Sequence, residues 1–225
     1  MTRYQVLTRE QRDTLMKKGV IWVAEERKVQ AGVVRGVLDG IEEIAGLKGR
    51  KLVLRHANLE EYLENPPPMD DKVFVPAAHY QAICRGLLEF FGTKGSRVLL
   101  IYVGEATFRR AIEGLPGLFA SAMKFMPGGL KKRAVFKVSA MQIAKITGVP
   151  PKVDLQRDRI IIHYFRCPSC DGYQSDQPVC FYECGMLMAL AEWATGKKHR
   201  ATEVECAAMG HQACVFEIVE AERGS

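Results

Sequence analysis

Apolar residues recur at helical spacing through most of the first two thirds of the chain. Segment 30–45 places its valine, leucine and isoleucine residues on one stripe, and segment 76–91 repeats its apolar positions until a glycine. Segments 115–126 and 130–146 have the same kind of pattern. Apolar positions three and four residues apart lie on one face of an α-helix, so all four segments are predicted to be helices.

Two shorter segments and one break interrupt this helical pattern. Segments 51–55 and 97–103 are apolar and β-branched enough to predict short strands, although 97–103 also fits a helix. A brief helix after Asn58 is predicted to stop at the prolines of 66–68, because consecutive prolines cannot continue a helix.

The last third of the chain has a different pattern. Segments 152–155 and 158–165 predict one hairpin of strands, and segments 199–206 and 212–219 predict a second one around a Met-Gly turn. Segment 180–195 lies between them and predicts a long helix closed by a glycine. An N-terminal helical layer followed by a small antiparallel sheet with a long helix predicts an α+β fold.

Length and charge restrict the classes of function. The chain has 225 residues, 48% of them hydrophobic, and no run of 18 apolar residues that would span a membrane. Its formal net charge of +6 is spread along the sequence, with short basic clusters only at 131–133 and 197–200. A nucleic-acid-binding face usually concentrates its charge, so no direct nucleic-acid binding is expected. The N-terminus lacks the apolar run of a secretory signal, and the expected location is cytoplasmic.

The cysteines are the clearest candidates for chemistry. Six of the seven occur between residues 167 and 214, and without a secretory signal they argue against a disulfide framework. Cys206 and Cys214 should lie where a tight turn brings two strand ends together. Cys180 begins a predicted helix, whose N-terminal dipole favours a thiolate. Zinc binds such thiolates well, and the alternative is that the cysteines are small buried hydrophobic residues.

Two stretches near the C-terminus resemble a known family. They are PVCFYECGMLMALAEWATGK and TEVECAAMGHQACVFEI, within residues 158–218. Both are similar to the 4-vinyl reductase domain family, which includes sensor domains of phenol- and toluene-responsive activators, archaeal hydrocarbon-binding proteins and a bacteriochlorophyll-synthesis protein. The family shares its fold with subunits of a Golgi tethering complex. The resemblance implies a ligand-binding domain of this type over 76–220, preceded by a helical, dimerisation region over 1–75.

The resemblance also implies a set of zinc ligands. The aromatic sensors of the family hold one zinc with three cysteines and a glutamate, which correspond by motif to Cys180, Glu203, Cys206 and Cys214. In a regular strand, Glu203 and Cys206 would point to opposite faces. The implied site therefore requires a bulge or a bent strand end between them.

The Cys-Pro-Ser-Cys sequence from Cys167 to Cys170 has no counterpart in the aromatic sensors. It supplies a second metal site with Cys184 and His163, replacement ligands for the first site, an iron–sulfur cluster with Cys180 and Cys184, or a dithiol redox switch. The remaining alternative is a pair of ordinary loop thiols. Metal binding is favoured over redox chemistry, because a reducing compartment keeps a simple thiol pair reduced.

The expected ligand is a hydrophobic small molecule. The histidine and tryptophan that grip phenol in the sensors are not found at the matching positions. The stretch NPPPMDDKVFVPAAHYQAICRGLLEFFG is similar to the bacteriochlorophyll-synthesis protein, so a tetrapyrrole of that pathway is a candidate beside an aromatic compound. Methionines and aromatic rings suit a large apolar ligand. The candidate pocket residues are Phe119, Met123, Phe125, Met126, Phe136, Met141, Ile161 and Tyr164.

Three classes of function follow from these observations. The first is a sensor or carrier domain with a structural zinc, whose four protein ligands leave no open position for catalysis. The second is a redox or iron–sulfur enzyme that uses the additional cysteines, and the third is an assembly or tethering subunit. The sequence shows no nucleotide loop or zinc-protease motif, so an enzyme is not favoured. The resemblance implies a homodimer, and Ala31, Gly32 and Gly36 would allow close packing between helices.

Overall fold

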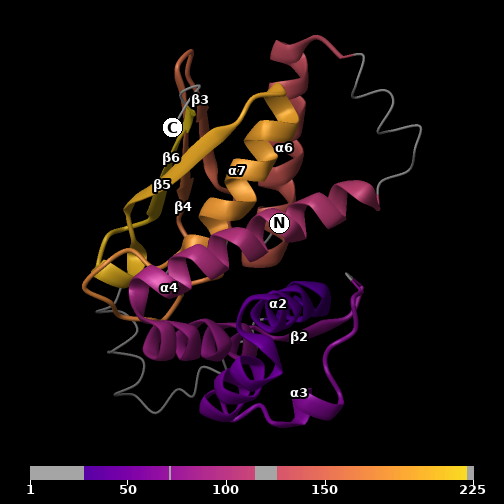
Figure 1. The fold of residues 1–225 in the computed structure, drawn as a ribbon. Helices are drawn as coiled ribbons and strands as arrows, with labels where there is room; N and C mark the ends of the chain where they lie inside the picture. Colours follow the sequence, from indigo (N-terminus) through magenta and orange to yellow (C-terminus); the bar gives the residue numbers. More distant parts are fainter. Residues whose placement is uncertain (1–27, 71, 115–125, 222–225) are drawn as a thin grey trace, which may run out of the picture.

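The chain is described by a computed structural model over residues 28–70, 72–114 and 126–221. The first part of it is helical, with one short antiparallel pair of strands, and occupies the lower half of Figure 1. Its elements are β1 (Lys28–Gln30), α2 (Ala31–His56), α3 (Glu61–Glu64), β2 (Phe74–Pro76) and α4 (Ala77–Glu113). The domain boundary expected after residue 75 falls within β2, which pairs with β1.

Helices α2 and α4 each bend at one glycine. Gly46 has a φ of 67° and Gly92 a φ of 63°, a left-handed conformation that glycine adopts without a steric penalty. Helical structure resumes after each bend, so the strands predicted over 51–55 and 97–103 are wrong, and the helical alternative for 97–103 is right. Burial of the apolar residues on one helical side outweighed the β propensity of both segments.

The second part of the chain is a four-stranded antiparallel sheet covered on one face by two helices (Figure 1). The strands follow the order β3 (Lys152–Leu155), β4 (Arg159–Tyr164), β6 (Cys214–Glu220) and β5 (His199–Glu205). The covering helices are α6 (Gly128–Thr147) and α7 (Phe181–Thr195), and the 3₁₀ helix η1 (Ala207–Met209) joins β5 to β6. These elements confirm the predicted hairpins, the predicted long helix and the α+β class.

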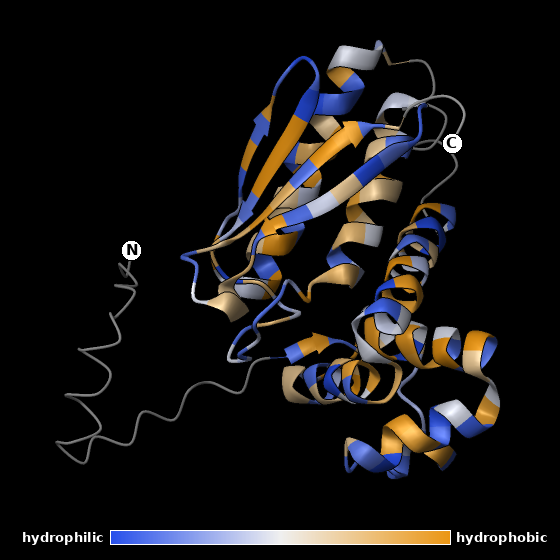
Figure 2. Ribbon diagram, turned by 60° about the vertical axis from the view of Figure 1, so that its left-hand side comes forward, coloured by the Kyte–Doolittle hydropathy of each residue, from blue (hydrophilic) through white to orange (hydrophobic). Residues whose placement is uncertain are grey.

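The core of this second part lies between the sheet and the helices. Along β4, Ile160, Ile162 and Tyr164 are buried, whereas Ile161 and His163 alternate with them and are only partly buried. This alternation follows from the two-residue period of a strand. The hydrophobic residues of the sheet are concentrated on its central strands, as the orange segments of Figure 2 show.

Two glycines allow α4 and α7 to cross in backbone contact, and this crossing joins the two parts of the chain. A Cβ on Gly104 of α4 would overlap the carbonyl oxygen of Tyr182, and a Cβ on Gly185 of α7 would overlap that of Ile101. Any larger side chain at either position would push the helices apart. The crossing therefore fixes the first turn of α7, and with it Cys180, against α4.

The small-residue stripe of α2 packs inside the chain. Ala31, Gly32 and Gly36 are buried, and a Cβ on Gly36 would lie 3.0 Å from the side chain of Arg110 and 3.1 Å from that of Thr107, both on α4. The stripe therefore gives no free surface for a second copy. The homodimer stays a prediction that depends on the family resemblance alone.

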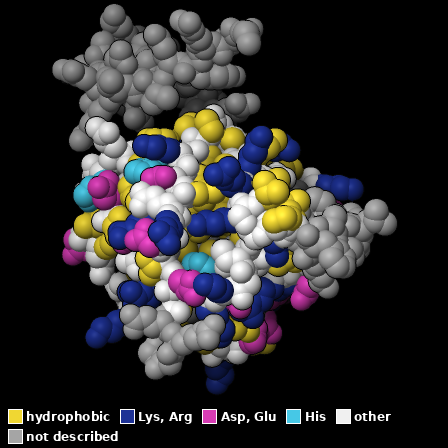
Figure 3. All heavy atoms as spheres, turned by 90° about the horizontal axis from the view of Figure 1, so that it is seen from above, with side chains coloured by type: hydrophobic (Ala, Val, Ile, Leu, Met, Phe, Trp, Pro, Cys, Tyr) yellow, Lys and Arg dark blue, Asp and Glu magenta, His cyan; other side chains and the backbone are white. Residues whose placement is uncertain are grey.

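Other expectations meet the structure only in part. The helix expected over 115–126 lies almost wholly outside the described residues. Among the helices that are described, none has the length and apolar character needed to cross a membrane. On the face drawn in Figure 3, Lys and Arg side chains are scattered among acidic and apolar ones. The absence of direct nucleic-acid binding stays a prediction.

Candidate metal centre

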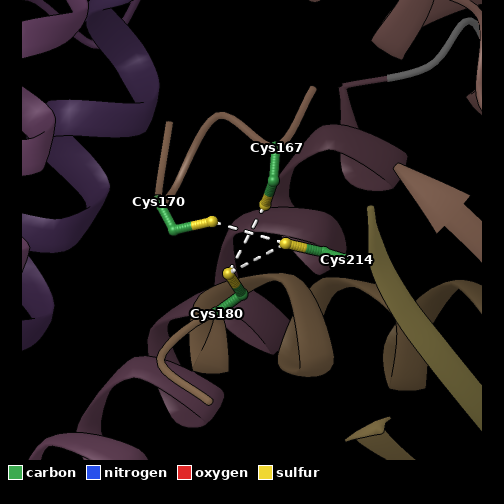
Figure 4. A group of neighbouring side chains, drawn as sticks. All are labelled: Cys167, Cys170, Cys180 and Cys214. Atoms are coloured by element: carbon green, nitrogen blue, oxygen red, sulfur yellow. Dashed lines mark hydrogen bonds between the residues drawn. The ribbon is translucent and has the colours of Figure 1, made fainter. Parts of the chain in front are cut away.

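Five cysteines from four places in the sequence converge at the N-terminal end of α7. Cys180 is the residue that precedes the helix, Cys206 follows β5, Cys214 begins β6, and Cys167 and Cys170 lie in the loop after β4. All five side chains are buried, with at most 1% of their surface exposed. In Figure 4 the sulfur atoms of the four cysteines drawn point toward one another.

The sulfur atoms are spaced as metal ligands are. The Sγ of Cys180 lies 3.9 Å from that of Cys206, 3.8 Å from that of Cys214 and 3.5 Å from that of Cys167. The Sγ of Cys170 lies 3.3 Å from that of Cys214. Tetrahedral zinc with bonds of about 2.3 Å separates its sulfur ligands by about 3.8 Å. The Cys180 pairs with Cys206 and Cys214 match that separation, and the other two pairs are somewhat shorter.

Glu203 completes the group that the family resemblance implies. Its side chain is buried, and the backbone N–H of Cys180 donates a hydrogen bond of 2.9 Å to its Oε2. The other oxygen, Oε1, has no hydrogen-bond partner among the described residues. A buried carboxylate oxygen without a partner is costly, and a cation beside it would remove that cost. The residues present therefore fit a bound metal ion.

A β-bulge in β5 brings Glu203 and Cys206 to the same side. Glu203 pairs with Phe216 and Glu205 with Val215, so one extra residue, Val204, is accommodated between them. Val204 is 51% exposed, which shows that it points outward. The irregularity that the sequence required between Glu203 and Cys206 is confirmed, and Glu205 is exposed rather than turned toward the cysteines.

The loop with Cys167 and Cys170 is held by side chains from two helices. Gln81 of α4 donates hydrogen bonds to the carbonyl oxygens of Pro168 at 3.3 Å and Asp171 at 2.9 Å. The hydroxyl of Ser169, between the two cysteines, donates to Oε1 of Glu183 on α7 at 3.0 Å. It also lies 3.0 Å from the hydroxyl of Tyr80, on α4. The two thiols are therefore fixed in position rather than carried on a free loop.

Burial keeps most of these thiols protonated in the absence of a cation. It raises the pKa of Cys167 to about 12 and that of Cys180 well above its ordinary value. The pKa of Cys170 is lowered, first because Cys167 donates a hydrogen bond to its sulfur and then because the other thiols do so. A metal-free cluster thus favours one thiolate among neutral thiols. Zinc ligands are thiolates, so metal binding has to release protons.

The structure places the other candidate ligands outside this cluster. The described residues contain two groups of four donors whose ligand atoms all lie within 4.8 Å of one another. One is Cys180, Glu203, Cys206 and Cys214, and the other is Cys167, Cys170, Cys180 and Cys214. Cys184 is buried nearby but belongs to neither group. His163 belongs to neither group and stacks on Phe165.

Sequence reasoning did not find that Cys180 and Cys214 are common to both groups. It also missed the residues that hold the loop, Tyr80, Gln81 and Glu183. Glu183 did carry a signal, because a carboxylate inside the apolar run of α7 needs a polar partner when it is buried. Burial raises the pKa of this carboxyl to about 7.

The candidate pocket residues do not enclose a cavity for a large ligand. Phe136 and Tyr164 line a hollow between α6 and the sheet whose free volume is about 10 Å³. Met126 packs at the edge of the same core. Met141 is 55% exposed and Ile161 lies on the alternate face of β4, so neither lines the hollow. The remaining candidates, Phe119, Met123 and Phe125, lie outside the described residues.

Comparisons with known proteins agree with this part of the chain. Residues 160–220 match the family model of the 4-vinyl reductase domain. An uncharacterised protein of Methanocaldococcus jannaschii is 27% identical over 67 residues, which are 30% of this chain and 36% of that protein. The match thus spans about a third of the relative's length.

Solved structures share the fold at low sequence identity. A point mutant of the T. tengcongensis H-NOX protein has a TM-score of 0.56 at 15% identity, covering 86% of this chain and 98% of that one. Subunit 3 of the trafficking protein particle complex from Naegleria fowleri, covalently bound to palmitic acid, has a TM-score of 0.50 at 14% identity, covering 65% and 93%. The fold expected from the tethering subunits is confirmed. Residues 160–220 of this chain form a 4-vinyl reductase domain, the family to which its C-terminal motifs pointed.

Proposed function

We propose that the chain is a small-molecule-binding domain, a sensor or a carrier, whose 4-vinyl reductase segment is held together by zinc. The observation that carries the proposal is the convergence of buried thiols and Glu203 around Cys180. A metal bound there would join the start of α7, the bulged end of β5 and the start of β6. Such a site acts on stability, because the free energy of metal binding adds to that of folding.

Zinc fits this donor set better than an iron–sulfur cluster does. Thiolates and one carboxylate suit a borderline cation in a closed tetrahedral site. An iron–sulfur cluster places its thiolates on separate irons with inorganic sulfide between them, so its cysteine sulfurs stand farther apart than around a single ion. Here all four sulfurs of the Cys167 group lie within 4.8 Å of one another.

The ligand in this proposal is a hydrophobic molecule bound between α6 and the sheet. The hollow beside Phe136 and Tyr164 has about 10 Å³ of free volume, whereas ligand pockets usually have about 300 Å³ or more. Binding therefore requires α6 to move away from β3 and β4. Support comes from the related folds, since the N. fowleri subunit is bound to palmitic acid and the H-NOX protein from Shewanella woodyi to the compound IWP-051. An aromatic compound or a tetrapyrrole is the finer expectation.

Metal content and thermal stability test the structural role of zinc. Cys206→Ser and Cys214→Ser should each lower the bound zinc and the melting temperature. Cys84→Ser is the matched control, because Cys84 is also buried but lies in the core of the first part, among the helices. If the two site variants keep their zinc, or lose no more stability than Cys84→Ser, the proposed structural zinc is refuted. Mass spectrometry of the molecule extracted from purified protein tests the ligand.

A second candidate function is thiol redox chemistry, favoured by one observation. The Sγ of Cys170 lies 3.3 Å from that of Cys214, and its pKa is lowered, which are properties of a reactive thiol. Burial of both cysteines opposes this function, because a redox partner has to reach the sulfur. Alkylation of the metal-free protein under native conditions separates the two functions, since a redox site predicts rapid modification of Cys170.

A further inference from the structure

The cluster offers more donors than one zinc ion can use. Five thiols and Glu203 form two groups of four, and the groups share Cys180 and Cys214. Zinc in a closed protein site takes four ligands. One ion held by Cys180, Glu203, Cys206 and Cys214 would leave Cys167 and Cys170 as buried thiols with no ion of their own. Their sulfurs would still stand 3.5 Å and 3.3 Å from two of its ligands.

We propose that the centre holds two zinc ions bridged by the thiolates of Cys180 and Cys214. Cys167 and Cys170 complete the coordination of one ion, and Glu203 and Cys206 complete that of the other. This inference rests on the proposed zinc function. It differs from a separate second site in that Cys184 and His163 take no part, in agreement with their absence from both groups.

The charges of such a centre balance as well as those of a common zinc site. Five thiolates and one carboxylate carry six negative charges, and two zinc ions carry four positive ones. The remainder, two negative charges, equals that of a single zinc held by four thiolates. One zinc with all six donors ionised would instead leave four negative charges in a buried site, which is far more costly. Two ions therefore allow every donor to bind in its ionised form.

The positions of Cys180 and Cys214 suit bridging. The Sγ atoms of these two residues lie 3.8 Å apart, and each is in contact with a sulfur from the Cys167–Cys170 loop, as the dashed lines in Figure 4 show. Cys180 precedes the first turn of α7, where the helix dipole stabilises negative charge. The sulfur of Cys214 accepts a hydrogen bond of 3.3 Å from the backbone N–H of Ala207. Both sulfurs are thus stabilised as thiolates by groups other than the metal.

The hydrogen bonds around the loop support a ligand role for Cys167 and Cys170. Gln81 fixes the carbonyl oxygens of Pro168 and Asp171, and Ser169 is held between the two helices. A loop that only covers the first ion would not require polar contacts on both sides of each cysteine. Donors fixed in advance bind a metal with less loss of conformational entropy.

Metal counting on the intact chain, folded and saturated with zinc, tests the inference. Two zinc ions per chain are expected. The double variant Cys167→Ser/Cys170→Ser should retain one, and the matched double variant Glu203→Gln/Cys206→Ser should also retain one, whereas Cys180→Ser should lose both. One zinc in the parent chain, unchanged in the first double variant, overturns the bridged centre but leaves the proposed structural zinc intact. No zinc at all overturns both.

Cadmium-113 NMR of the parent chain keeps the test independent of how the variants fold. Two resonances with a mutual cadmium–cadmium coupling are expected, since a shared thiolate transmits that coupling. A single resonance, or two without coupling, would overturn the bridge. Iron with a visible absorption band in place of zinc would overturn the centre as proposed.

Discussion

The backbone N–H of Cys180 donates a hydrogen bond of 2.9 Å to Oε2 of Glu203, 23 residues further along the chain. This bond ties the start of α7 to the bulged end of β5 and leaves Oε1 of the same carboxylate buried without a partner among the described residues. The carboxylate therefore serves as a helix cap on one side and is free to bind a metal on the other.

Replacement of Glu203 should weaken metal binding more than its stability cost implies. Glu203→Gln keeps the size and one acceptor oxygen but removes the negative charge, so zinc affinity should fall by more than about tenfold, since even the loss of an outer-shell partner costs that much. Competition with a chromogenic chelator measures the affinity. Glu205→Gln is the control, because Glu205 is exposed on the same strand. Equal affinities in the two variants would show that Glu203 is no ligand.

Gly185→Ala should destabilise the chain by separating α4 from α7. The new methyl group would overlap the carbonyl oxygen of Ile101, and overpacking of this kind costs about 1–3 kcal/mol or more. Gly128→Ala, at the start of α6, is the control, because a Cβ there has no neighbour within 4 Å. Urea midpoints measure both changes. If Gly185→Ala unfolds at the parent midpoint, the two helices do not cross in contact as described.

The buried thiol of Cys84 should make stability fall at high pH. Burial raises its folded pKa from 9.0 to about 12, so between these values the unfolded chain loses the proton while the folded chain keeps it. The folded state then binds more protons, and the free energy of unfolding declines as pH rises above 9, by at most about 1.4 kcal/mol per pH unit. Cys84→Ala should reduce that slope between pH 9 and 10.5 in chemical denaturation. An identical slope in both proteins would contradict the shift.

Enlarging the hollow beneath α6 should favour ligand uptake. Phe136→Ala removes the largest buried side chain that lines it and should cost about 3–5 kcal/mol of stability. The same change should increase the binding of an apolar fluorescent probe. Ile218→Ala is the control, because Ile218 is fully buried in the same core but does not line the hollow. Equal probe binding by both variants would indicate that the ligand lies elsewhere.

The sequence predicted the second part of the fold better than the first. In β4 the alternation of Ile160, Ile162 and Tyr164 and the glycine after α7 are local signals, and local signals determined these elements. In α2 and α4 the segments after Gly46 and Gly92 contain residues that favour strands in isolation. They are helical because α2, α4 and α7 pack together, which no short segment can reveal.

The candidate site was predictable in part for the same reason. Cys206 and Cys214 flank a tight turn, so their proximity follows from local sequence. The position of Cys167 and Cys170 beside Cys180 depends on contacts with Tyr80 and Gln81 almost 90 residues away. Such long-range contacts leave no pattern in the sequence, and the sharing of Cys180 and Cys214 could not be read from it.

X-ray absorption at the zinc edge, combined with elemental analysis of the purified full chain, tests the central claim most directly. The cysteine-rich centre predicts at least one zinc per chain, with a first shell dominated by sulfur at about 2.3 Å and a minor oxygen contribution from Glu203. A chain that carries no stoichiometric zinc, or zinc with only nitrogen and oxygen neighbours, would contradict the claim.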